Sequence, residues 1–90
     1  MDLDALLTIT KAIGVAESAT RDPQTLMLAN KLFLHCKRIH ELGVWGPDGR
    51  EGLRSETLDL MAALEGEDLD NAAERVSEAM ELVVDLYLDD

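Results

Sequence analysis

Residues 22–43 read DPQTLMLANKLFLHCKRIHELG, and this stretch predicts one long helix with both of its ends marked. Asp22 is a favoured N-cap residue, and Pro23 suits the first helical position, where an N–H has no intrahelical partner. Gly43 provides the helix stop. Between these ends apolar residues recur at three- and four-residue steps, so they share one face of the helix. That predicted face comprises Leu26, Ala29, Leu32, Phe33, Cys36, Ile39 and His40.

The same periodicity predicts three further helices, and no stretch alternates as a strand would. The first covers residues 2–19, the third is short and stops at Gly66, and the last begins at a cap, Asp68 or Asp70. The predicted inward face of the first helix comprises Leu3, Leu6, Ile9, Ile13 and Ala16, with Leu7 at its edge. That of the third helix comprises Leu53, Leu60 and Leu64. That of the last helix comprises Leu69, Ala72, Ala73, Val76, Ala79, Met80, Val83 and Tyr87.

Short connections between these helices predict antiparallel neighbours. We therefore expect an all-α fold, a small antiparallel four-helix bundle built from two helical hairpins. We expect residues 1–90 to form a single domain, with one hairpin over 2–43, a turn over 44–52 and an acidic hairpin over 53–88. Gly14 lies inside the first helix, where we expect it to mark the close approach of a neighbouring element.

The composition indicates a small, unexported domain. A chain of 90 residues holds one modest core, and 3% aromatic residues means that aliphatic side chains and alanine must build it. No apolar run is long enough to span a bilayer, and the first residues carry acids where a signal peptide carries bases. The single cysteine, Cys36, allows no internal disulfide, which fits a reducing compartment. We therefore expect a cytoplasmic protein.

The net charge of -11 is concentrated in the second half of the chain. Residues 1–54 hold seven acids and seven bases, whereas residues 55–90 hold twelve acids and one base, Arg75. Such a distribution repels nucleic-acid phosphates and anionic membranes and speeds association with a basic partner. The alternative is that these acids only keep the surface solvated.

The sequence offers little material for catalysis. Cys36 and His40 are four residues apart on one helical face, but that face is the apolar one, which favours a structural role for both. His35, Cys36 and His40 lack a second ligand cluster for zinc, and residues 65–71 lack the spacing of a calcium loop. No glycine-rich phosphate loop is present. We expect no enzyme, no catalytic residues, no metal and no cofactor.

Direct nucleic-acid binding is also not expected. The second helix carries three bases, Lys31, Lys37 and Arg38, which are too few beside an acidic half of the same domain. These bases either pair with acids of the last helix or face solvent.

Two helices carry apolar residues beyond their predicted inward faces. Met27 and Leu34 fall among Lys31, Arg38 and Glu41 on the polar side of the second helix. This position predicts either a small apolar patch for a partner or cover by a third or fourth helix. The last helix ends LVVDLYL, nearly apolar all round, so a second copy of the chain is expected to cover it, in particular at Leu86 and Leu88.

Trp45 sits in the turn, next to the helix stop. Either it folds back over the last turn of the second helix and caps the core, or it is exposed and anchors a partner.

Four acids of the last helix, Glu74, Glu78, Glu81 and Asp85, share one outer face. Together with the apolar patches they predict a non-enzymatic protein-binding regulator, inhibitor or assembly factor, with another protein or a second copy as partner. The alternative is a nucleic-acid mimic, in which these acids block a basic groove of a nucleic-acid-binding enzyme. In length, helical content and acidity the chain is similar to small acidic inhibitors of nucleases and antiviral systems, although it shares no motif with them.

Overall fold

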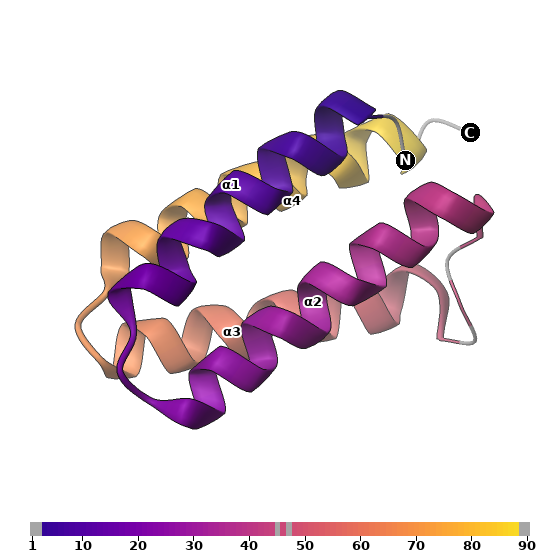
Figure 1. The fold of residues 1–90 in the computed structure, drawn as a ribbon. Coiled ribbons are helices and arrows are strands. Elements are labelled where there is room, and N and C mark those ends of the chain that lie inside the picture. Colours follow the sequence, from indigo (N-terminus) through magenta and orange to yellow (C-terminus); the bar gives the residue numbers. More distant parts are fainter. Residues whose placement is uncertain (1–2, 45, 47, 89–90) are drawn as a thin grey trace.

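The computed structural model describes residues 3–44, 46 and 48–88, with side chains up to Leu82. Within these ranges the chain forms four helices and no strand: α1 (Leu3–Ala19), α2 (Pro23–Leu42), α3 (Gly49–Gly66) and α4 (Asp70–Leu88). They pack into a four-helix bundle, which confirms the predicted all-α class (Figure 1). Among the described residues, no helix combines the length and the apolarity that crossing a membrane requires.

Each helix packs against two neighbours. α1 contacts α2 and α4, and α3 contacts the same two helices. Figure 1 shows α1 beside α4 in one layer and α2 beside α3 in the other, with the α1–α2 and α3–α4 loops at the same end of the bundle. The helices α2 and α4 therefore occupy opposite corners, and their outer surfaces face away from each other.

The ends of α2 lie where its sequence predicts them. The Asp22 carboxylate accepts a hydrogen bond from the Gln24 N–H at 3.0 Å, and Pro23 is the first helical residue. At the other end Gly43 adopts a φ of 70°, and its N–H donates to the Ile39 carbonyl at 2.8 Å. Glycine takes this left-handed conformation at little cost because it has no Cβ.

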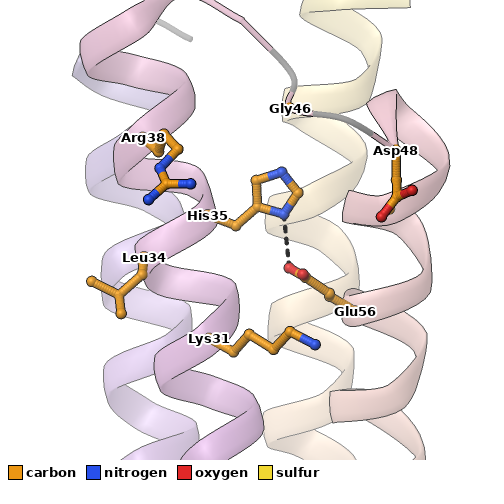
Figure 2. A pocket seen from close by; sticks show the side chains of 8 residues that line it. Lys31, Leu34, His35, Arg38, Gly46, Asp48 and Glu56 are labelled. Carbon is orange, nitrogen blue, oxygen red and sulfur yellow. Dashed lines mark hydrogen bonds and ion pairs between the residues drawn. The ribbon is translucent and has the colours of Figure 1, made fainter.

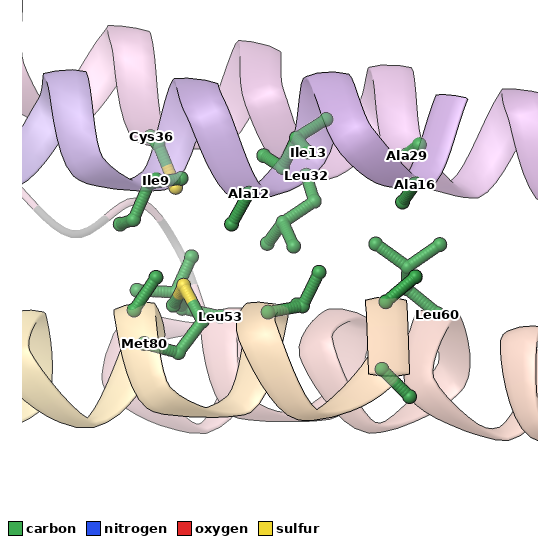
Figure 3. Close-up of a cluster of buried hydrophobic side chains, with 14 of the residues drawn as sticks. Ile9, Ala12, Ile13, Ala16, Ala29, Leu32, Cys36, Leu53, Leu60 and Met80 are labelled. Carbon is green, nitrogen blue, oxygen red and sulfur yellow. The ribbon is translucent and has the colours of Figure 1, made fainter. Parts of the chain in front are cut away.

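One apolar core runs the length of the bundle between the four helices (Figure 3). Small residues alternate with branched ones, which lets the helices approach closely while Ile and Leu fill the space between them. The buried apolar residues are Ala5, Ile9, Ala12, Ile13, Ala16, Ala29, Leu32, Cys36, Ile39, Leu53, Leu60, Leu64, Ala72, Ala73, Val76, Ala79 and Met80. Most members of the predicted inward faces are among them.

The third helix is longer than its sequence suggests. It spans 18 residues and begins at Gly49, so the predictions of a short third helix and of a turn reaching residue 52 are wrong. Glycine favours turns, but here the Gly52 N–H donates to the Asp48 carbonyl at 3.3 Å, a helical bond that precedes the buried Leu53. Gly49, with a φ of 62°, makes the entry to the helix.

The buried faces of α1 and α2 keep the centre of the predicted faces and differ from them at the margins. Leu3, Leu7 and Leu26 are exposed, whereas Ala5, Ala12 and Thr25 are buried in their place. Helices that pack closely bury small residues where they touch, and the larger leucines are displaced to the flank.

Gly14 does not lie against a neighbouring element, contrary to expectation. A Cβ at this position would meet no atom within 4 Å.

Candidate functional site

The outer face of α2 carries an open stripe of alternating apolar and basic side chains, which we call the α2 stripe: Met27, Lys31, Leu34 and Arg38. Their spacing of four, three and four residues places them on one line of the helix, about 16 Å long. Met27 is 71% exposed and Leu34 is 52% exposed. No helix covers them, so of the two predicted alternatives the structure shows the apolar patch. Leu42, also exposed, extends the line by one turn and was not predicted.

The two bases of the α2 stripe, Lys31 and Arg38, have no ion-pair partner in the described part of the chain. Lys37 approaches Glu41 at 3.9 Å, but both side chains are exposed, and such pairs contribute little. The acids of α4 lie at the opposite corner of the bundle. The cationic groups of Lys31 and Arg38 therefore remain available to carboxylates of another molecule.

A hollow of about 290 Å³ adjoins the α2 stripe on the side of α3 (Figure 2). Its floor is crossed by a hydrogen bond between His35 Nδ1 and Glu56 Oε2, at 2.8 Å, which ties α2 to α3. Lys31 extends from α2 toward α3 beside this pair (Figure 2). The lining residues are Lys31, Leu34, His35, Arg38, Gly46, Asp48, Gly52 and Glu56. Three of the four α2-stripe residues thus border a concave surface that could receive a side chain.

A second hollow, of about 270 Å³, lies between α3 and α4. We call it the α3–α4 hollow; it is lined by Arg54, Thr57, Leu58, Met61, Ser77, Met80 and Glu81. Leu58 stands 57% exposed beside it. The sequence does not predict this surface. Leu58 is an apolar residue outside the predicted inward face of its helix, but the other side of the hollow is formed by residues of α4, which no pattern within α3 reveals.

The acidic residues of α4 form a separate surface. Glu74, Glu78 and Glu81 are all exposed, at the corner opposite the α2 stripe. One small partner therefore cannot contact both outer faces at once, although the sequence suggested that the two could act together.

Several predicted partner-binding residues cannot be placed. Trp45 lies outside the described residues, and so do the side chains of Asp85, Leu86 and Leu88. The two alternatives for Trp45, and the cover of the last helical turns by a second copy, stay predictions.

Cys36 is completely buried, in agreement with a structural role. Burial raises the pKa of its thiol to about 12, and the nearby Glu56 carboxylate adds to the effect. The thiol is therefore protonated at neutral pH and is a poor nucleophile. Among the described residues, no group of three or more His, Cys, Asp or Glu side chains is placed to hold a metal ion.

The chain matches no protein-family model, no curated protein and no solved structure.

Proposed function

We propose that this chain is a non-enzymatic protein-binding module, acting as a regulator, inhibitor or assembly factor, and that it docks through the α2 stripe. The observation that carries the proposal is the exposure of Met27 and Leu34 between two bases that have no ion-pair partner among the described residues. Burying these two side chains in an interface would contribute roughly 2–4 kcal/mol. Arg38 and Lys31 would add selectivity by pairing with carboxylates.

The net charge of the whole chain indicates which sign of net charge the partner carries. A net charge of -11 slows association with an acidic protein and speeds association with a basic one. The proposed partner therefore carries a net positive charge and offers the α2 stripe a helix that bears apolar and acidic side chains. Docking of a helix on such a line is typical of helix–groove recognition. A cytoplasmic location is part of the proposal, because the lone thiol of Cys36 suits a reducing compartment.

Affinity capture from the source cells tests this function. Wild-type chain, the Met27→Glu/Leu34→Glu variant and Leu7→Glu are immobilised separately, and bound proteins are compared by quantitative mass spectrometry. Leu7 is the matched control, since it is 48% exposed and lies on α1. We expect a protein that wild type and Leu7→Glu retain and the double variant loses. Equal retention by the double variant, or no retained protein, contradicts the proposal.

The alternative, nucleic-acid mimicry, is supported by the unbroken line of exposed carboxylates at Glu74, Glu78 and Glu81. It predicts that charge reversal at Glu74 and Glu78 abolishes capture and that affinity falls steeply with salt. Docking through the α2 stripe predicts little effect of these two reversals. Glu81 is left unchanged in this comparison because it also borders the α3–α4 hollow.

A further inference from the structure

The α3–α4 hollow is a second apolar surface, on a different face from the α2 stripe. The half-buried Met61 and the buried Met80 form part of its lining, and methionine side chains adapt readily to a partner. Leu58 projects beside them, 57% exposed. We propose that a second copy of this chain covers this face, forming a symmetric dimer in which Leu58 of each copy packs over the hollow of the other.

Arg54 and Glu81 give the rim of the hollow one base and one acid, which suits a second copy of the chain even though two copies of net charge -11 repel each other at long range. Arg54 stands on α3 and Glu81 on α4, both lining the same hollow, so they lie at a similar height on opposite sides of it. Neither forms an ion pair with any residue in the described part of the chain. A two-fold interface requires a surface that is complementary to itself, and one base facing one acid across an apolar centre has this property.

Only one orientation of the two-fold axis relative to the helices pairs Arg54 of each copy with Glu81 of the other. An axis parallel to the bundle places α3 of one copy over α4 of the other, with antiparallel directions. Because Arg54 and Glu81 lie at a similar height, each arginine then faces the glutamate of the second copy, and two ion pairs form. An axis across the helices would instead bring like charges together.

The face is large enough for a dimer. The bundle measures 36 × 22 × 18 Å, so one long face offers on the order of 700 Å², close to the roughly 800 Å² per partner of a standard interface. The α2 stripe lies at another corner and remains open in this dimer. The dimer and the proposed partner docking can therefore succeed or fail independently.

Charge swapping tests the dimer, with sedimentation equilibrium or light scattering as the readout and circular dichroism as the check of folding. Arg54→Glu and Glu81→Arg each place like charges opposite each other, so each is expected to weaken dimerisation at least about tenfold. The exchange variant Arg54→Glu/Glu81→Arg keeps the net charge and restores both pairs, so it is expected to dimerise like the wild type.

A mixture of the two single variants gives the sharpest result. In the two-fold arrangement Glu at position 54 of one variant faces Arg at position 81 of the other, and Arg54 faces Glu81, so the mixture is expected to form a heterodimer. Glu78→Arg is the matched control: it makes the same charge change as Glu81→Arg but lies outside the hollow, so the dimer should persist. Reduced net negative charge alone would strengthen association in both variants.

A monomeric wild type, or single variants that dimerise as well as the wild type, would overturn the proposal. So would a mixture that remains monomeric while each variant is folded. Loss of the dimer in Met27→Glu, with Arg54→Glu unaffected, would mean that the α2 stripe joins the two copies instead.

Discussion

The hydroxyl of Thr20 donates a hydrogen bond to Oε2 of Glu67 at 2.5 Å, joining residues that are 47 positions apart in the sequence. Thr20 follows α1 and Glu67 follows α3, so this bond ties together the two loops at one end of the bundle. The Arg21 N–H lies 3.4 Å from the other oxygen of the same carboxylate. The Glu67 carboxylate thus binds two consecutive residues of the α1–α2 loop, Thr20 and Arg21.

This carboxylate makes stability depend on pH. The hydrogen bond from Thr20 is the main cause that lowers the pKa of Glu67 below its ordinary value of 4.5. Because the folded pKa lies below the unfolded one, the stabilisation is present above pH 4.5 and is lost as the pH falls through the folded pKa. Urea unfolding from neutral pH to pH 3 should show Glu67→Gln less stable than wild type, with the gap closing in acid. Glu65→Gln is the control, and a gap that widened in acid would contradict this assignment.

The cap of α2 is expected to contribute measurably. Asp22→Ala removes the acceptor of the Gln24 N–H and should lower the free energy of unfolding by about 1 kcal/mol. Asp22→Asn retains an oxygen acceptor and should restore most of the loss. Equal stabilities of the alanine variant and the wild type in urea denaturation would show that the cap is dispensable.

Two leucines of the same helix should differ sharply when they are shortened. Leu32 is fully buried, so Leu32→Ala is expected to destabilise the fold by about 2–5 kcal/mol through lost packing and a cavity. Leu34 lies on the α2 stripe, and Leu34→Ala should change stability by no more than about 0.5 kcal/mol. Thermal or urea unfolding measures both, and a large loss at Leu34 would mean that another part of the chain covers the α2 stripe.

The Cys36 thiol should be inert in the folded protein. It is completely buried, and its pKa of about 12 leaves almost no thiolate at pH 8. A disulfide reagent such as DTNB should therefore react only after denaturation. Rapid reaction of the native protein would contradict the structural role of Cys36 and would favour a reactive site formed by Cys36 and His40.

Helix number, helix type and the bounds of α2 could be predicted because capping residues and apolar spacing act within one segment. The start of α3 could not, since Gly49 and Gly52 favour a turn locally and join the helix only where Leu53 is drawn into the core. Which residues at the margin of α1 are buried likewise depends on which small residues, such as Ala5 and Ala12, meet the neighbouring helices. Local signals do not contain this information.

The residues of a candidate surface that lies on one helix could also be identified from the sequence, whereas those of a surface formed by two helices could not. The residues of the α2 stripe could be grouped from the sequence because they share one helix, but their exposure depends on the corner that α2 occupies and could not be predicted. The α3–α4 hollow and the pair of His35 with Glu56 each need two helices, so no spacing within one segment reveals them. The opposite placement of α2 and α4 follows from the packing order of four helices, which one sequence leaves open.

The most direct test of docking through the α2 stripe is the dissociation constant of the captured partner, measured by isothermal titration for wild type, Met27→Glu/Leu34→Glu and Leu7→Glu. The double variant is expected to bind at least about 30-fold more weakly, because charged side chains would replace the two apolar contacts at the centre of the interface. Leu7→Glu should bind within about twofold of the wild type. Equal affinity of the double variant and the wild type would contradict the assignment of this surface.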